Sequence, residues 1–399
     1  MFTNLFSTLL KTKLVFTLPS KKKILIYDNN NFNYFKKFLN NFDHEILYTR
    51  KEIINLPILA ISLFKNFLSK IGYNYKYQYI KYVNPKIIIT MTDNDLDFLR
   101  YKFKDKKKIA IQNAYRKDNF PDIFSYNKYE KKNEYNLDYI FCFNNSIGEL
   151  YKRSFGAKPI VTGSLKNNLI KKVKIKDKKT IGYISQFRMR MVNEKYMFPY
   201  TDFIKNLNFS TFKKKNYNNI TTKEFYEKDE KVIKYVLKYL LKKNITLNII
   251  GVMKKNQEIE KRYYENICKG YKFNFIKNNS YGNSYKIIDE YKIIIGLDST
   301  MLYESLARKI TVAFFSVRRS SFKNYNSFFG FPYNKKAKGF FWTSSANYLE
   351  VSRVLDNLFN LKKSHYKNKV KSYLSNLTYF DTNNKKFSSE LKNIFKREI

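Results

Sequence analysis

Residues Lys292–Lys309 (KIIIGLDSTMLYESLARK) combine side chains that could hold a phosphorylated ligand. The apolar run Ile293–Ile295 predicts a buried strand, Gly296 follows it, and Ser299–Thr300 predict the start of a helix. The backbone N–H groups and the dipole at a helix start attract phosphate. Glu304 follows one turn later, where a carboxylate can accept hydrogen bonds from the vicinal hydroxyls of a ribose. The segment therefore predicts a nucleotide-sugar site.

The same residues would also make an ordinary helix start with no ligand. Ser and Thr are frequent N-caps, and the helix dipole favours a Glu in the first turn. With Thr300 as the cap, the capping-box position falls on Tyr303, so Glu304 is not placed to close the box. The local sequence leaves capping and ligand binding open, and the rest of the chain has to decide between them.

Length and composition predict a folded protein with room for two domains. The chain has 399 residues, of which 44% are hydrophobic and 18% aromatic. This is enough for two domains of about 200 residues, each with its own core. Cys142 and Cys268, together with His44 and His365, offer no metal-ligand spacing and no disulfide framework. The composition fits a reducing compartment and leaves little material for a zinc site or a histidine-based triad.

The formal net charge of +44 comes from 77 Lys and Arg against 33 Asp and Glu. The basic residues are spread along the chain, which is typical of a solvated face. The chain is also crowded with Asn, Ile, Tyr and Phe, which share A/T-rich codons with Lys, and it lacks helix-turn-helix, RNP-like and Arg-rich motifs. We therefore expect no nucleic-acid partner, but we expect attraction to anionic lipid of about 1 kcal/mol per Lys near the surface.

Residues 1–22 are predicted as a basic and apolar N-terminal extension that mimics a short signal peptide. Lys11 and Lys13 interrupt its apolar run, no small-residue cleavage site follows, and Pro19–Lys21 leads into a strand. No apolar run reaches the ~18 residues of a membrane span. The sequence predicts a cytoplasmic protein, with peripheral contact at the inner face of the cell membrane left open.

Apolar runs of strand length alternate with helical stretches from end to end, which predicts an α/β fold built from βαβ units. In the first half the predicted strands are Lys23–Asp28, Glu45–Thr49, Lys86–Met91, Lys108–Gln112, Asp138–Phe143 and Pro159–Gly163. In the second half they are Thr180–Ser185, Thr246–Gly251, Phe273–Ile276, Ile293–Gly296 and Thr311–Ser316. We predict two Rossmann-like domains, each a doubly wound parallel sheet, that face a cleft.

The predicted domains are residues 23–170 and 180–365, joined by a basic linker at 171–179 and followed by a helical, basic tail at 366–399. Helices are predicted at Glu224–Lys243, Gln257–Lys269, Ser299–Arg308 and Ala346–Phe359. Residues Met189–Thr222 have weak periodicity and are predicted as a long insertion or an irregular lid.

Two segments each allow two interpretations. From Leu56 to Ile71 the apolar residues keep a helical stripe, and tyrosines interleaved with lysines follow between Tyr73 and Tyr82. This pattern fits a helix packed on a sheet, or a basic aromatic surface that docks on a membrane. The segment Phe328–Trp342 fits a loop whose rings stack on a base or sugar, or buried packing around the single Trp of the chain.

The chain resembles a family of bacterial surface-carbohydrate proteins, the O-antigen biosynthesis proteins. These are regarded as glycosyltransferases of the two-Rossmann GT-B type. The resemblance covers most of the chain from Lys22 to about Leu361. The segments that carry it, besides GLDSTMLYESLARK, are IYDNNN (Ile26–Asn31), HEILYTR (His44–Arg50), NPKIIITMTDND (Asn84–Asp95), IAIQNAYR (Ile109–Arg116), LDYIFCFNNSIGELYK (Leu137–Lys152), GSLKNN (Gly163–Asn168) and IGYISQFR (Ile181–Arg188).

The resemblance implies a GT-B-like fold that binds a nucleotide sugar in the C-terminal domain and an acceptor in the N-terminal domain. It also implies catalysis without a metal or another cofactor, with the nucleotide sugar as substrate. The run Asp93-Asn94-Asp95 superficially offers a metal motif. Carboxylates at a strand end and a helix start are good caps, however, and no third or fourth ligand accompanies these two.

The donor site is expected beyond the first strand of the second domain and at the helix start described above. Arg188 suits a bidentate grip on phosphate, because the departing nucleotide needs its charge neutralised by preset donors. The predicted donor-binding residues are Ser185, Gln186, Arg188, Asp298, Ser299, Thr300 and Glu304.

The acceptor site is expected at the strand ends of the first domain. Inverting glycosyl transfer needs a general base for the acceptor hydroxyl, and Asp28, at the end of the opening strand, is the best-placed carboxylate, followed by Asp93. Gln112 and Asn113 end the fourth strand and could orient acceptor hydroxyls. Asn144 opens a helix and suits capping as well as acceptor contact.

The sequence thus predicts a metal-independent glycosyltransferase of cell-surface polysaccharide biosynthesis, acting on a nucleotide-activated sugar and a glycan or lipid-linked acceptor. Three alternatives stay open: a sugar-nucleotide epimerase, a glycerophosphate-type polymer transferase on the same fold, and a non-catalytic binder of polyanions or nucleic acid. Inversion or retention at the sugar is not decided by fold analogy.

Overall fold

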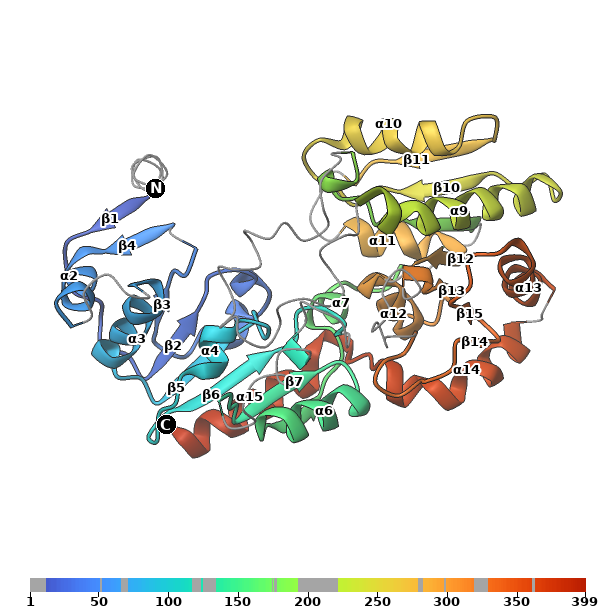
Figure 1. Ribbon diagram of the computed structural model, residues 1–399. Coiled ribbons are helices and arrows are strands. Elements are labelled where there is room, and N and C mark those ends of the chain that lie inside the picture. Colours follow the sequence, from blue (N-terminus) through green and yellow to red (C-terminus); the bar gives the residue numbers. More distant parts are fainter. Residues whose placement is uncertain are drawn as a thin grey trace. The chain divides into compact units, whose positions relative to one another are not determined.

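The structure is a computed structural model that describes residues 12–50, 52–65, 71–116, 123–124, 134–173, 175, 178–192, 222–278, 283–297, 299–318, 329–360 and 363–399. The chain forms two compact units, each built around its own sheet (Figure 1). Unit 1 comprises Met1–Ala114, Tyr126–Leu169 and Asp381–Ile399, and unit 2 comprises Tyr115–Ser125 and Ile170–Phe380.

The sheet of unit 1 has six strands in the order β3-β2-β5-β6-β7-β8, all paired in parallel. Their bounds are β2 (Ile24–Tyr27), β3 (His44–Leu47), β5 (Ile87–Thr90), β6 (Lys107–Ile111), β7 (Tyr139–Cys142) and β8 (Lys158–Val161). Each corresponds to a strand predicted from the sequence, because buried parallel strands are continuous apolar runs with recognisable ends.

Both faces of this sheet are covered. On one face alternate strand residues such as Ile24, Ile26, Ile87 and Ile89 pack in one core with Phe387 and its neighbours on α15 (Lys385–Glu398). The same face carries η1 (Phe32–Tyr34) and η2 (Lys36–Leu39). Further helices of the unit are α3 (Ile71–Val83), α4 (Leu96–Arg100), α6 (Asn145–Phe155), α7 (Leu165–Leu169) and η5 (Thr382–Asn384).

A smaller substructure is formed by chain segments that lie before β2 and after β3 in the sequence. It is a two-stranded parallel sheet of β1 (Lys13–Val15) and β4 (Ile53–Asn55), and α2 (Leu56–Lys65) follows β4 directly. Its helix α2 packs on α3. The tyrosines of α3 are engaged inside the unit: Tyr79 donates to Glu45 at 2.8 Å, and Tyr77 stacks on Phe103. For α3 the structure therefore bears out packing rather than a free aromatic surface.

The sheet of unit 2 has seven strands in the order β11-β10-β9-β12-β13-β15-β14, parallel except for the short β14. The bounds are β9 (Lys179–Ile184), β10 (Leu247–Ile250), β11 (Phe273–Ile276), β12 (Tyr291–Gly296), β13 (Thr311–Phe315), β14 (Lys338–Gly339) and β15 (Trp342–Thr343). The first five were predicted. The two-residue strands β14 and β15 were not, because they are too short to carry a periodic signal.

Helices surround the second sheet as the βαβ pattern requires. They are η3 (Met189–Met191), α9 (Thr222–Leu241), α10 (Gln257–Ile267), α11 (Asn283–Asp289), α12 (Thr300–Ala307), α13 (Tyr348–Phe359) and α14 (Lys363–Leu377). Trp342, Phe329 and Phe341 are buried together, with ring centroids 4.8–5.1 Å apart. Phe329, Phe341 and Trp342 therefore form core packing, whereas Tyr333 in the same segment is exposed.

The chain returns to the first unit at its end. Residues after Phe380 were predicted as part of a tail, whereas α15 supplies a face of the core of unit 1. Asn168, at the end of the first half, holds this return: its Nδ2 donates to Oδ1 of Asn384 at 2.9 Å, and its Oδ1 accepts from the backbone N–H of Asp381 at 3.1 Å. Of the stretch Met189–Thr222, residues 193–221 lie outside the described residues. Among the helices that the structure describes, none is long and apolar enough to cross a membrane.

Candidate nucleotide-sugar site

Each sheet has one switch point, where the chain changes the direction in which it adds strands. In unit 2 the chain goes from β9 to β10 and β11 on one side and then to β12 and β13 on the other. In unit 1 the corresponding change lies between β2 and β5. Ligands of doubly wound sheets bind beyond the carboxyl ends of the strands at such points. The predicted donor residues follow β9 and β12, and Asp28 and Asp93 follow β2 and β5.

Two hydrogen bonds hold the start of α12, and the one made by Ser299 is the helix cap. Oγ of Ser299 accepts from the backbone N–H of Met301 at 3.3 Å, and Oγ1 of Thr300 accepts from the backbone N–H of Tyr115 at 3.0 Å. The Tyr115 ring stacks on Tyr303, with centroids 3.5 Å apart and an interplanar angle of 5°. Tyr115 follows β6 in the sequence but belongs to unit 2. Thr300 thus anchors a distant segment of chain, a role that its position in the sequence did not indicate.

Glu304 is a buried carboxylate held by the neighbouring helix. The hydroxyl of Tyr285 on α11 donates to Oε1 of Glu304 at 3.0 Å. One turn further along both helices, Nε of Arg308 donates to Oδ1 of Asp289 at 2.9 Å, and both of these side chains are fully buried. The guanidinium also lies over the Tyr285 ring, 5.9 Å from its centroid. Two contacts between α11 and α12, four residues apart on each helix, therefore fix Glu304 near the start of α12.

Ser185, directly after β9, is buried in a polar network. Its hydroxyl donates to Oε1 of Glu260 on α10 and accepts from the Tyr264 hydroxyl at 2.9 Å. Glu260 also accepts from the backbone N–H groups of Val252 and Met253, at 2.9 Å each. The network ties the loop after β9 to the loop after β10. Sequence reasoning missed Glu260, whose position inside a helix gives no functional signal.

Arg188 is exposed, and its Nη1 donates to the backbone oxygen of Phe187 at 3.0 Å. Gln186 is half-buried, and Asp298 lies outside the described residues. A further guanidinium follows β13: Arg318 holds Asp229 of α9 with hydrogen bonds of 2.6 and 2.9 Å to Oδ2. Arg318 was not among the predicted residues, although an Arg close after an apolar strand is a signal that could have found it.

Asp28 accepts hydrogen bonds from several protein groups. It is buried, and its backbone has a φ of 73°, in the left-handed region. Nε and Nη2 of Arg50 each donate to Oδ2 at 3.1 Å, Thr92 donates to Oδ2 at 2.9 Å, and the backbone N–H of Asn30 donates to Oδ1 at 3.0 Å. The Thr92 bond spans the switch point between β2 and β5. Arg50 follows β3 and is half exposed, so it is the member of this group that a ligand can reach.

Asp93 and Gln112 brace the ends of neighbouring strands. Asp93 is fully buried and accepts from the Tyr151 hydroxyl and from the backbone N–H of Asn113 at 3.0 Å. Oε1 of Gln112 accepts from the backbone N–H of Phe143 at 2.8 Å. The contact of Asp93 with Asn113 joins the end of β5 to the end of β6, and its contact with Tyr151 joins β5 to α6. The contact of Gln112 with Phe143 joins β6 to β7. A contact of Gln112 or Asn113 with an acceptor stays a prediction.

Two further polar residues of this edge are helix caps. Oδ1 of Asn144 accepts from the backbone N–H of Ile147 at 2.9 Å, and Oδ1 of Asp95 accepts from the N–H of Phe98 at 2.9 Å. Asp95 is therefore a helix cap, as expected, whereas Asp93 accepts from the Tyr151 hydroxyl and the N–H of Asn113. Within the described ranges, no cluster of three or more His, Cys, Asp or Glu side chains could hold a metal ion.

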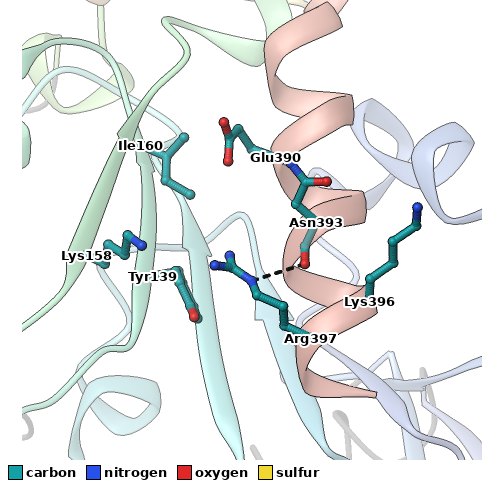
Figure 2. A pocket seen from close by; sticks show the side chains of 7 residues that line it. All are labelled: Tyr139, Lys158, Ile160, Glu390, Asn393, Lys396 and Arg397. Atoms are coloured by element: carbon teal, nitrogen blue, oxygen red, sulfur yellow. Dashed lines mark hydrogen bonds between the residues drawn. The ribbon is translucent and has the colours of Figure 1, made fainter.

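Unit 1 also has a groove at the opposite end of its sheet. It has a volume of about 390 Å³ and is lined by Tyr139, Lys158, Ile160, Glu390, Asn393, Lys396 and Arg397. Tyr139 and Lys158 are the first residues of β7 and β8, so the groove begins at the amino ends of these strands. Figure 2 shows Lys158 on the strand side and Arg397 on the α15 side of the groove. Its position separates it from the predicted acceptor residues.

Comparisons with known proteins agree with this architecture. No curated protein matches the sequence. The wall teichoic acid polymerase TagF is 12% identical, with a TM-score of 0.51 over 95% of this chain and 89% of that one. The UDP complex of MnaA from S. aureus is 14% identical, with a TM-score of 0.52 over 94% of this chain and 96% of that one. A structure described as a putative UDP-N-acetylglucosamine 2-epimerase from Listeria monocytogenes is 12% identical, with a TM-score of 0.53 over 95% and 98%.

These likenesses establish a GT-B-like fold, an α/β architecture with two parallel sheets. The same fold serves polymerases and epimerases, so it does not select an activity. Residues 109–395 match the family described as "putative O-antigen biosynthesis protein". This span is more than half of the chain, and the protein belongs to that O-antigen biosynthesis family.

Proposed function

We propose that the protein is a glycosyltransferase of surface-polysaccharide biosynthesis, which transfers a sugar from a nucleotide-activated donor to a glycan or lipid-linked acceptor without a metal. The observation that carries the proposal is the placement of Glu304. A buried carboxylate, held by Tyr285 at 3.0 Å, lies one turn into α12, directly beyond the central strand at the switch point of unit 2. A ribose is recognised by such a carboxylate, and a phosphate by such a helix start.

The donor site in this proposal consists of the residues after β9 and β12. Ser299, Thr300 and the N–H groups of α12 take the phosphates, Glu304 takes the ribose, and Arg188 neutralises the departing nucleotide. Gln186 and Asp298 complete the proposed set. Support comes from MnaA, a protein of the same fold that was determined with UDP.

The acceptor side of the proposal rests on the switch point of unit 1. Asp28 lies there with Arg50 and Thr92 as partners. For Asp28 to take the proton of an acceptor hydroxyl, Arg50 has to move away, and its half-exposed side chain has room to do so. Asp93 is the second candidate, and its full burial behind Tyr151 makes it the less accessible one.

A thermal-shift panel with UDP, GDP, CDP, ADP, dTDP and CMP tests the donor site. Ligand at 100 times its dissociation constant adds about 2.7 kcal/mol to the free energy of unfolding. We expect one nucleotide to stabilise the wild type and Glu290→Gln, but not Glu304→Gln. Glu290 is a matched control, since it precedes β12 at the other end of the strand and pairs with Lys179. Failure of all six nucleotides to stabilise the wild type would contradict the donor site.

Product analysis separates the alternatives on this fold. A transferase releases the nucleotide only when an acceptor is present, whereas an epimerase converts the nucleotide sugar with no acceptor. A glycerophosphate-type polymer transferase would release a nucleoside monophosphate from an activated glycerol phosphate. Strong low-salt binding to polyanions with no nucleotide preference would favour a non-catalytic binder, because counterion release makes such binding steeply salt-dependent.

A further inference from the structure

β1 and the residues directly after it expose apolar side chains at alternate positions. Leu14, Phe16 and Leu18 have exposed fractions of 37%, 75% and 46%. Large apolar side chains scattered singly over a surface are ordinary, but several together indicate an interaction surface.

The helix α2 exposes a second apolar surface. Its residues from Leu56 to Phe64 include no charged side chain. Ile58 and Ser62 are buried on the inward side, whereas Ala60 and Phe64 lie on the opposite side, and Phe64 is 92% exposed. A helix that is apolar on its outer side as well needs a second apolar environment there. Packing on α3 satisfies only its inner side.

The two apolar surfaces belong to the same corner of unit 1 (Figure 1). β1 pairs with β4, and α2 begins at the residue after β4. Asn55 fastens the pieces together: its Nδ2 donates to the backbone oxygen of Thr17 at 2.6 Å, and its Oδ1 accepts from the N–H of Ile58 at 3.1 Å. We call Leu14, Phe16, Leu18, Ala60 and Phe64 the apolar corner.

The segment that carries Leu14, Phe16 and Leu18 is basic, and the exposed Glu52 is the acidic residue next to Lys13 in the β1–β4 pair. Residues 12–25 contain four lysines, Lys13, Lys21, Lys22 and Lys23, and no Asp or Glu. Lys22 pairs with the exposed Asp43 at 3.0 Å. If two copies of the chain joined through this corner, a two-fold interface would bring the lysines against their own copies, and like charges oppose such contact. An anionic surface with an apolar interior matches both properties of the corner.

We propose that the apolar corner docks the protein on an anionic lipid surface. Phe16 and Phe64 enter the interfacial layer of the bilayer, and the lysines contact the headgroups. This mode differs from docking through the tyrosines of α3, which are packed inside the unit. It is independent of the nucleotide site, so failure of one proposal leaves the other standing.

Vesicle co-sedimentation of the full chain tests the proposal. Vesicles of phosphatidylcholine with a quarter phosphatidylglycerol are compared with phosphatidylcholine alone at 50, 150 and 500 mM NaCl. We expect binding to the anionic vesicles that weakens with salt. Phe16→Ser with Phe64→Ser should lower the partition coefficient at least about tenfold, since two large apolar groups no longer leave water. Leu349→Ser is the matched control, because Leu349 is 80% exposed but lies on α13 in unit 2.

Both substituted phenylalanines are exposed, so the double variant should keep the unfolding temperature of the wild type. Equal vesicle binding by the wild type and the double variant would overturn the proposal. It would also be overturned if the wild type bound no vesicles and formed a concentration-dependent dimer that the double variant lost, which would assign the corner to self-association. Loss of binding in Leu349→Ser to the same extent would show that the effect is not specific to the corner.

Discussion

The Tyr285 hydroxyl donates to the Glu304 carboxylate at 3.0 Å. Four residues further along each helix, Asp289 and Arg308 form a fully buried ion pair. The spacing matters because residues four apart lie on one face of a helix. α11 and α12 are therefore joined by two contacts: the Tyr285–Glu304 hydrogen bond, which can serve a ligand, and the Asp289–Arg308 ion pair, which is structural. Arg308 also binds the beginning of the Ile170–Phe380 segment of unit 2, since its Nη1 donates to the backbone oxygen of Ile170 at 3.1 Å.

The first prediction concerns Tyr285 as a positioning residue. Tyr285→Phe keeps the ring under Arg308 but removes the hydroxyl that orients Glu304. We expect nucleotide affinity to fall about tenfold, the equivalent of one hydrogen bond to a charged group, with little change in stability. Isothermal titration with the nucleotide identified in the panel measures this. A large loss of stability without a loss of affinity would assign Tyr285 to packing alone.

The second prediction concerns the buried pair itself. Arg308→Met should lower the free energy of unfolding by about 3–5 kcal/mol, because it leaves the Asp289 carboxylate buried without its partner. Arg353→Met serves as the control: Arg353 pairs with Glu350 at 2.8 Å at a partly exposed site, where about 0–1 kcal/mol is expected. Urea unfolding of the two variants gives the comparison. Equal midpoints would contradict a structural role for the pair.

A third prediction tests Glu260, which organises the loops after β9 and β10. Glu260→Ala removes the acceptor of the Val252 and Met253 N–H groups and of the Ser185 hydroxyl, and should cost about 3 kcal/mol. Glu258→Ala, two residues away on the same helix, removes only an exposed pair with Lys277 and should leave the unfolding midpoint unchanged. If the two variants unfold at the same urea concentration, the network does not hold the loops.

The candidate base gives a fourth prediction. Asp28→Asn keeps the shape of the side chain but removes its basicity, so transfer should fall by about 10²–10⁴-fold. Asp93→Asn keeps most of the brace between β5 and β6, and its effect should appear in the unfolding temperature more than in turnover. The measurement is turnover at saturating donor together with the unfolding temperature of each variant. If both variants keep full activity, another residue must be the base.

Lys108 supplies a prediction on pH. It is buried, and its Nζ donates to the backbone oxygens of Phe98, Leu99 and Tyr101 at 2.7–3.0 Å. Burial lowers the pKa of Lys108 to about 7. Between that value and the ordinary lysine pKa of about 10.4, the unfolded chain binds a proton that the folded chain does not. The contribution of Lys108 to stability therefore increases as the pH rises through this window, by at most about 1.4 kcal/mol per pH unit.

Urea unfolding of the wild type and Lys108→Met between pH 7.5 and 9.5 checks this slope. Lys108→Met should be less stable at every pH, because the neutral amine that predominates above pH 7 still donates two hydrogen bonds to the surrounding carbonyl oxygens. Its stability should rise less steeply with pH. Parallel slopes for the two proteins would show that the Lys108 ammonium is not depressed in the folded state.

Local sequence determined most of the fold. Apart from β14 and β15, the strands of both sheets are short apolar runs, so burial on two faces left a signal that needs no knowledge of their partners. The cap at Asn144 and the helix start at Ser299–Thr300 were visible as residue types, although the cap is Ser299 and not Thr300. The order of these runs also fixed where the carboxyl ends of the strands would gather polar residues, which is why the predicted donor and base residues flank the two switch points.

Tertiary structure decided which of those residues have partners in the protein. The hydrogen bonds of Thr300 to Tyr115 and of Ser185 to Glu260 join positions 185 and 75 residues apart, and no local pattern encodes such distances. The packing of α15 against the sheet of unit 1 and the ion pair of Arg50 with Asp28 also join segments that are distant in the sequence. A sequence specifies which side chains need burial or a hydrogen-bond partner, whereas the identity of the partner depends on packing between segments that meet only in the folded chain.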